Sequence, residues 1–209
     1  HLGERRLAKL FAEFGAPTVE TAMETILDAA EELLVTEGYA RFTMRKLAER
    51  IGYSATTIYL YFTDQDELFS SLIDEAFAKL IEAFHALDAV QDATEKLKAL
   101  GRTYVRFGLE TPHHYRLLFM IRPDLDAKRP PTSRMAQLAW DCLRNAVKAV
   151  IEQDAKNSLD PEIVSMSLWA SLHGLVSLAI GASGGMSRER VEEVSRFLID
   201  RQVSSIVQG

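Results

Sequence analysis

The chain has 209 residues, and 47% of them are apolar, which is enough to form a substantial buried core. Its 24 Lys and Arg residues stand against 30 Asp and Glu residues, and the net charge of −6 excludes a strongly basic protein that coats nucleic acid. With 6 Pro, 11 Gly and one cysteine, Cys142, the composition also excludes disordered, collagen-like and disulfide-rich chains. No Cys/His cluster has zinc-ligand spacing, so we expect neither a metal nor another cofactor.

The expected location is the cytoplasm, because the chain has one cysteine and no apolar leader after a basic start. One uncharged stretch, residues 163–186, is long enough to be weighed against a bilayer span of about 20 residues. Its serines, glycines and His173 dilute its hydrophobicity, and no basic residues flank it closely. We therefore interpret it as a helix buried in protein and expect no membrane contact.

Apolar residues recur with a helical period through most of the chain, and no segment alternates with the period of two that marks strands. This pattern predicts an all-α protein of about nine helices. A first helix is expected to begin with Thr21 and Glu24 as a capping box and to end at Gly38. Two short helices follow, capped by Thr43 and Ser54, and the second is expected to end near residue 61.

A long amphipathic helix comes next, with Thr63 and Asp66 at its expected start and an apolar stripe from Leu68 to Phe84. Residues 122–131 contain three prolines and are predicted to form a loop. The later helices are expected over residues 93–109, 112–121, 133–155, 161–182 and 188–207, with Thr111 and Asp160 as caps before Pro112 and Pro161.

Residues 43–61 have the length and punctuation of a helix-turn-helix, because Gly52, Tyr53 and Ser54 separate two short helices. In such a motif the first helix crosses the DNA backbone, and the second presents its first residues to base edges in the major groove. The N-terminal segment 1–17 carries Arg5, Arg6 and Lys9, and it is expected either to touch phosphates as an arm or to pack against the first helix.

The stretch from Ile26 to Leu68, ILDAAEELLVTEGYARFTMRKLAERIGYSATTIYLYFTDQDEL, resembles the N-terminal domain of TetR/AcrR-family transcriptional regulators. Trp169, His173 and Gly174 look like the Trp-His-Gly (WHG) pattern in the C-terminal domain of one subgroup, and residues 115–119 suit the same subgroup. The resemblance implies an N-terminal extension over 1–20, a helix-turn-helix DNA-binding domain over 21–66, and a helical ligand-binding and dimerisation domain over 67–209.

Carried over residue by residue, the resemblance implies that the first short helix and the end of the second approach phosphates, while Ala55, Thr56 and Thr57 face the bases. Gln65 stands where the family usually has a phosphate-binding lysine. Between residues 24 and 70 there are 4 basic and 9 acidic residues, so we expect DNA affinity to depend less on salt than it does for a strongly basic protein. The residues assigned to DNA are Thr43, Arg45, Ser54, Ala55, Thr56, Thr57, Tyr59, Tyr61 and Gln65.

The larger C-terminal region contains no catalytic arrangement, so we expect no enzyme. Aromatic and sulfur-bearing side chains on several helices suit a cavity for a small, largely apolar effector, with Tyr104 or His173 as a polar handle. The residues assigned to this ligand are Phe77, Phe84, Tyr104, Phe107, Met120, Met135, Trp140, Trp169 and His173.

The last two helices are expected to pair with those of a second subunit in a four-helix interface, which Gly174 would allow to approach closely. The residues assigned to the homodimer interface are Leu172, Val176, Ile180, Val194 and Leu198. The sequence thus predicts a ligand-responsive regulator, most often a repressor in such families, that binds palindromic operator DNA as a homodimer. The alternative is a helical ligand-binding protein with weak or no operator binding, and an enzyme is a distant third.

Overall fold

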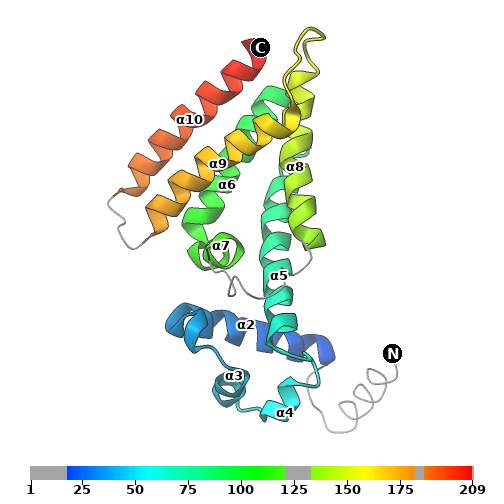
Figure 1. Cartoon of the computed structure of the whole chain (residues 1–209), viewed down its shortest axis with the longest axis vertical. Helices are drawn as coiled ribbons and strands as arrows, with labels where there is room; N and C mark the ends of the chain where they lie inside the picture. Colours follow the sequence, from blue (N-terminus) through cyan, green and yellow to red (C-terminus); the bar gives the residue numbers. More distant parts are fainter. Residues whose placement is uncertain (1–17, 121–132, 182–185, 209) are drawn as a thin grey trace. The chain divides into compact units, whose positions relative to one another are not determined.

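The computed structural model describes residues 18–120, 133–181 and 186–208, and these residues form nine α-helices and no strand, which confirms the predicted fold class. The predictions for residues 1–17 and for the loop 122–131 lie outside the described residues. The helices are α2 (Val19–Glu37), the 3-10 turn η1 (Tyr39–Arg41), α3 (Met44–Ile51), α4 (Ala55–Ile58), α5 (Gln65–His85), α6 (Ala93–Glu110), α7 (Pro112–Phe119), α8 (Arg134–Ile151), α9 (Pro161–Ile180) and α10 (Arg188–Gln208) (Figure 1).

The chain divides into two compact units after Leu72, within helix α5. Residues 65–72 of α5 belong to the first unit, and residues 73–85 belong to the second. The sequence placed the boundary at residue 66, where α5 begins. The division shows that a single helix contributes to both cores.

The first unit is a small bundle in which α3 contacts both α2 and α4. Its core consists of large side chains that are almost fully buried, and the ring of Phe69 lies 4.9 Å from that of Phe42 and 5.0 Å from that of Tyr39. Phe62, at the turn after α4, is 1% exposed and belongs to this core. Other buried members of this core are Ile26, Leu33, Leu47, Ile58 and Leu68.

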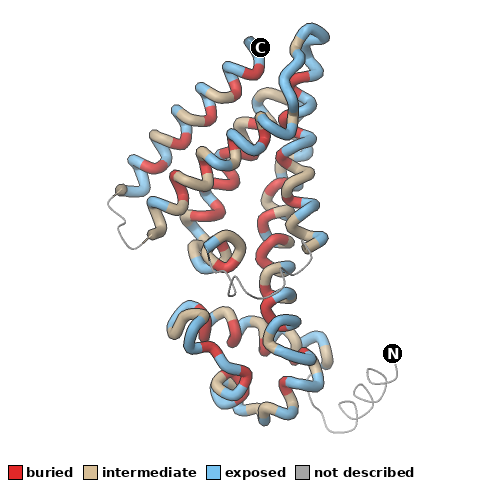
Figure 2. Tube along the Cα trace, viewed as in Figure 1, coloured by how far each residue is buried: buried red, intermediate tan, exposed pale blue. Residues whose placement is uncertain are grey.

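In the second unit, helix α6 is central, because it contacts α7, α8, α9 and α10. Figure 2 shows that buried positions recur along one side of each surrounding helix, as an amphipathic pattern requires. α9 and α10 run antiparallel and contact each other (Figure 1). α9 is the one described helix that is long and apolar enough to cross a bilayer, yet it packs against α6, α8 and α10.

Several helix starts were predicted correctly. The side chains of Thr43, Ser54 and Asp160 accept hydrogen bonds from the backbone amides of Lys46, Thr57 and Glu162. Each of these side chains satisfies an amide that has no partner within its helix.

Two predicted helix starts were wrong. α2 starts earlier than expected, because Thr18 rather than Thr21 accepts the capping bond. α5 is capped by Asp64, whose carboxylate accepts from the Glu67 amide at 2.8 Å, while the Glu67 carboxylate accepts from the amide of Thr63. Thr111 occupies the N-cap position before Pro112 as predicted, but its hydroxyl donates to the carbonyl of Phe107 and makes no capping bond.

Four helices end before the predicted residue. α7 ends at Phe119 and α9 at Ile180, each two residues early. α4 ends at Ile58 rather than near Tyr61, because the amides of Leu60 and Tyr61 bond to carbonyls three residues back and tighten the chain into a turn. α8 ends at Ile151, where the chain continues as a series of turns.

Gly108 permits the close approach of α6 to α9. A Cβ atom at this position would lie 2.4 Å from Val176 Cγ1 and 2.9 Å from Tyr115 Cδ2. Val176 and Tyr115 are both fully buried, so neither has open space into which it can shift.

Changing Gly108 to Ala should therefore lower the free energy of unfolding by about 1–3 kcal/mol, because the added methyl overpacks the core. Urea denaturation followed by circular dichroism measures this change. Arg106→Ala, at an exposed position of the same helix, is the control and should change it by less than about 0.5 kcal/mol. Equal stability of the Gly108→Ala protein and the wild type would contradict the packing described.

Candidate functional site

The two short helices α3 and α4 are joined by a tight turn. Gly52 has φ 71° and ψ 21°, a left-handed conformation that glycine adopts without strain, and the amide of Tyr53 bonds to the carbonyl of Ala48 at 2.9 Å. Ser54 then begins α4. The turn thus ends one helix and starts the next within three residues, which is the geometry of a helix-turn-helix.

The first turn of α4 is accessible. Thr56 is exposed, and Ala55 and Thr57 are partly exposed, while Ile58 anchors the helix in the core. The hydroxyls of Thr57 and Ser54 lie 2.8 Å apart, so part of their hydrogen-bonding capacity is used within the turn. Thr56 is consequently the most accessible hydroxyl on this helix.

The aromatic residues after α4 differ in exposure. Tyr59 is 50% exposed, whereas Tyr61 is partly buried, and burial raises the pKa of its hydroxyl. Leu60, which sequence reasoning did not assign, is 55% exposed. The only feature of the sequence that could have indicated its exposure is that an apolar residue stands between two tyrosines. Gln65, at the start of α5, is partly exposed.

The four basic residues of this unit's described part all have acceptors within the unit. The guanidinium of Arg45 lies 2.9 Å from Glu49, that of Arg50 lies 3.0 Å from Glu32, and the ammonium of Lys46 pairs with Glu37. Arg41 donates to the Glu37 carbonyl at 2.9 Å.

Two properties of these pairs set the charge of the surface. The hydrogen bond from Lys46 lowers the pKa of the Glu37 carboxyl, so that group stays ionised near neutral pH. The side chains of Arg45 and Glu49 are both largely exposed, so their pairing contributes little to stability. The surface around α3 therefore carries basic side chains paired with acidic ones and is not a positive patch.

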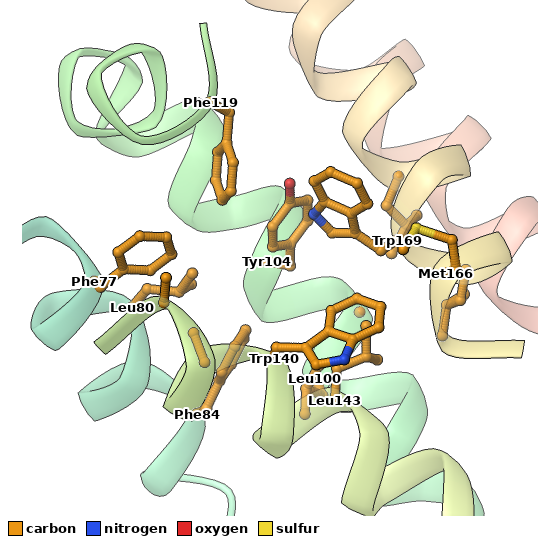
Figure 3. Close-up of a pocket in the computed structure, with 15 residues that line it drawn as sticks. Phe77, Leu80, Phe84, Leu100, Tyr104, Phe119, Trp140, Leu143, Met166 and Trp169 are labelled. Carbon is orange, nitrogen blue, oxygen red and sulfur yellow. The ribbon is translucent and has the colours of Figure 1, made fainter. Parts of the chain in front are cut away.

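The second unit contains an apolar cavity of about 400 Å³ (Figure 3). Phe77, Phe84, Tyr104, Trp140 and Trp169, all assigned to a ligand from the sequence, line it. The lining residues that the sequence did not assign to a ligand are Leu80, Leu100, Gly101, Phe119, Ala136, Ala139, Leu143, Met166, Leu168 and Leu172.

Four residues assigned to the ligand do not line this cavity. Phe107 is buried, and its ring is tilted against that of His114 with ring centroids 6.4 Å apart, while Met120 is 41% exposed just after α7. Met135 packs on the core, outside the lining. His173 lies behind the lining residue Trp169 and stacks on it, with ring centroids 5.0 Å apart.

Behind the cavity wall, a hydrogen-bonded chain links Tyr104 of α6, Tyr115 of α7 and His173 of α9. The two tyrosine hydroxyls lie 3.0 Å apart, and the Tyr115 hydroxyl lies 2.7 Å from Nδ1 of His173. Burial lowers the pKa of His173, raises that of Tyr104, and raises that of Tyr115 to about 12. The three groups are therefore uncharged near neutral pH.

The residues assigned to a dimer interface fall into two groups. Leu172 and Val176 are 3% and 0% exposed within their own chain, so they cannot contact a partner, and their assignment was wrong. They face α6, where Val176 packs against Gly108. Ile180, Val194 and Leu198 remain partly exposed.

Two family profiles match the chain. The profile described as bacterial regulatory proteins, tetR family, matches residues 26–72, and the profile described as Tetracyclin repressor-like, C-terminal domain, matches residues 97–202, just over half of the chain.

Curated relatives match over shorter stretches. An uncharacterised helix-turn-helix transcriptional regulator of Xanthobacter autotrophicus is 38% identical over 90 residues, which are 42% of this chain and 45% of the relative. The fatty acid metabolism regulator protein of Bacillus subtilis is 36% identical over 73 residues, which are 35% of this chain and 37% of the relative. The alignments thus span half or less of these relatives.

A solved structure extends the likeness in fold to most of the chain. FadR from Bacillus subtilis, a transcriptional regulator solved in complex with stearoyl-CoA, superposes with a TM-score of 0.73 at 19% identity, over 87% of this chain and 97% of that one. With both its N-terminal and its C-terminal region matched by profiles of one family, the chain belongs to the TetR family of bacterial regulatory proteins.

Proposed function

We propose that this chain is a ligand-responsive transcriptional repressor that binds palindromic operator DNA as a homodimer and leaves it when a small, largely apolar effector binds. The observation that carries this proposal is the combination, in one chain, of an accessible first turn on α4 and an apolar cavity in the second unit. Transcriptional regulators among the relatives support the same function. Such a regulator acts in the cytoplasm and is not an enzyme.

In this proposal the first turn of α4 reads the major groove. Thr56 and Thr57 can hydrogen-bond base edges or contact a thymine methyl, but the turn offers no Arg or Asn for a bidentate base contact. Thr43, Arg45 and Tyr59 supply phosphate contacts, with Ser54, Ala55, Tyr61 and Gln65 around them. Direct readout is consequently modest, and the shape of the DNA supplies the remaining specificity.

The effector acts through α5. This helix supplies Phe77, Leu80 and Phe84 to the cavity wall and residues 65–72 to the first unit. A ligand that binds more tightly to the DNA-free arrangement shifts the population toward it and lowers operator affinity. The stearoyl-CoA bound to FadR supports a ligand role for the helical domain of this fold.

We also place the chain in the WHG subgroup. Trp169 lines the cavity and stacks on His173 with ring centroids 5.0 Å apart, and Gly174 follows His173 in the same helix. The spacing of the three residues on α9 and this stack support the assignment.

The homodimer interface is proposed on the face that α9 and α10 share. Leu178 of α9 is 68% exposed and Phe197 of α10 is 67% exposed, and the partly exposed Ile180, Val194 and Leu198 lie on the same two helices. Two antiparallel helices from each subunit form a four-helix bundle, which covers these apolar side chains.

Operator binding is tested by a gel shift at moderate salt with DNA from upstream of the gene. We expect the wild type to bind specifically and Thr56→Asp to lose at least tenfold in affinity, because a carboxylate in the first turn of α4 repels phosphates while suiting the helix start. Ser158→Asp is the control, because it adds the same negative charge at an exposed position of the second unit and should leave DNA affinity unchanged. Undetectable specific binding by the wild type would favour the alternative, a helical ligand-binding protein without an operator.

Removing the carboxylate that pairs with Arg45 should strengthen DNA binding. In Glu49→Gln, Arg45 is free to meet phosphate and one nearby negative charge is lost, so we expect affinity to rise about two- to fivefold. Fluorescence anisotropy with labelled operator measures the change. Glu152→Gln breaks a pair of the same spacing, with Lys148 in the second unit, and should leave affinity unchanged. Unchanged or weaker binding by Glu49→Gln would show that Arg45 does not contact phosphate.

The proposed interface is tested with Phe197→Glu. A carboxylate buried in an apolar interface carries a large desolvation penalty, so we expect the dimer to dissociate at least a hundredfold more readily. Sedimentation velocity over a range of concentrations measures the dissociation. The control Leu138→Glu alters an exposed leucine on α8 and should leave the dimer intact. A dimer insensitive to Phe197→Glu would place the interface elsewhere.

A further inference from the structure

The cavity wall carries no charge in the part of the chain that the structure describes. Its polar side-chain groups belong to Tyr104, Trp140 and Trp169. Trp140 already donates its indole N–H to Glu162, at 3.2 Å. A charged ligand would lose its hydration without gaining an opposite charge from these walls, whereas an uncharged apolar ligand replaces water at little cost.

The position of the Tyr115 proton follows from its neighbours. The Tyr115 hydroxyl lies 2.7 Å from Nδ1 of His173 and 3.4 Å from the carbonyl oxygen of the same residue, which can only accept. Both contacts are satisfied when Tyr115 donates toward His173, and we infer this arrangement of protons. In it, Nδ1 is the acceptor and Nε2 carries the proton, 3.4 Å from the hydroxyl of Ser177.

The Tyr104 proton follows in turn. Because the Tyr115 hydroxyl donates its proton to His173, its oxygen accepts a hydrogen bond from the Tyr104 hydroxyl, 3.0 Å away. The remaining neighbour of Tyr104 among the polar lining groups is Trp169, whose indole N–H can only donate. With its proton directed to Tyr115, the Tyr104 oxygen is left as an acceptor on the wall of the cavity (Figure 3).

We propose that the cavity selects an uncharged, largely apolar molecule that carries a hydrogen-bond donor, a hydroxyl or an N–H, which the Tyr104 oxygen accepts. A ketone or ester of the same shape has no donor and meets an acceptor. Tyr104 determines this specificity, and Tyr115 and His173 are positioning residues, because they hold its proton away from the cavity. The inference rests on the proposed function only in treating the cavity as the effector site.

Intrinsic fluorescence reports occupancy directly, because the chain has 2 tryptophans and both line the cavity. The probes are decan-2-ol, decan-2-one, decanoate and decyltrimethylammonium, which share a ten-carbon chain and, apart from the weak carbonyl band of the ketone, do not absorb near 295 nm. We expect decan-2-ol to bind at least fivefold more tightly than decan-2-one, as one hydrogen bond allows. Both ions should bind at least tenfold more weakly than decan-2-ol.

Two variants separate selection from general damage. Tyr104→Phe should reduce the affinity for decan-2-ol to that for decan-2-one and leave the ketone unaffected. His173→Phe keeps a ring on Trp169 but removes the Nδ1 acceptor and leaves Tyr115 only the backbone carbonyl at 3.4 Å, so the Tyr115 proton turns to the nearer Tyr104 oxygen at 3.0 Å and the Tyr104 hydroxyl donates into the cavity. The ratio of alcohol to ketone affinity should then fall below one. Leu143→Met, an apolar change in the lining, should preserve the ratio.

The outcomes are decisive without DNA. A ketone that binds as well as the alcohol, an ion that binds more tightly than either, or no binding of decan-2-ol up to its solubility limit would overturn the inference. A parallel loss of affinity for both neutral probes in His173→Phe would overturn the positioning role. Adding operator DNA tests the proposed function separately. If decan-2-ol binds as expected but leaves operator affinity unchanged, the ligand class stands and the effector role fails.

Discussion

The second unit depends on how closely α6 approaches α9 and α10. Gly101 and Gly108 lie two turns apart on α6, and a Cβ atom at Gly101 would be 3.1 Å from Ile199. With both contact points lacking side chains, the bulky Tyr104 between them is directed to the cavity and the hydrogen-bonded chain. The interior thus stays close-packed where the helices meet and open only beside the aromatic wall.

This arrangement has a consequence for ligand response. The cavity draws its wall from α5, α6, α8 and α9 and from Phe119 at the end of α7, so a molecule that filled it would contact all of these helices. Only α5 also contributes to the first unit, and its aromatic and aliphatic residues at 77, 80 and 84 occupy successive turns of one face. A rigid helix transmits a small shift at that face along its length, provided that the ligand binds the two arrangements with different free energies.

The sequence predicted the class of fold and the start of α4, because caps, glycine turns and helical periodicity are local signals. Ser54 capped its helix as expected, since its oxygen meets an amide only three residues away. Leu172 and Val176 were misplaced because periodicity marks an apolar face without saying whether a neighbouring helix or a second subunit covers it. Similarly, Leu100 and Leu143 line the cavity, and nothing in the sequence distinguishes them from leucines in the closed core.

The electrostatics of the first unit follow from the same distinction between local and tertiary effects. An excess of carboxylates was evident from counting, but only the fold shows that Arg45, Lys46 and Arg50 each meet one. A guanidinium that leaves a carboxylate for a phosphate exchanges one anion for another, and the carboxylate remains nearby and repels the DNA. The net charge brought to the backbone is therefore smaller than the number of basic residues, and fewer counterions are released. Since phosphate attraction is reduced in this way, base contacts and DNA shape would supply a larger share of the binding free energy in the proposed complex with operator DNA.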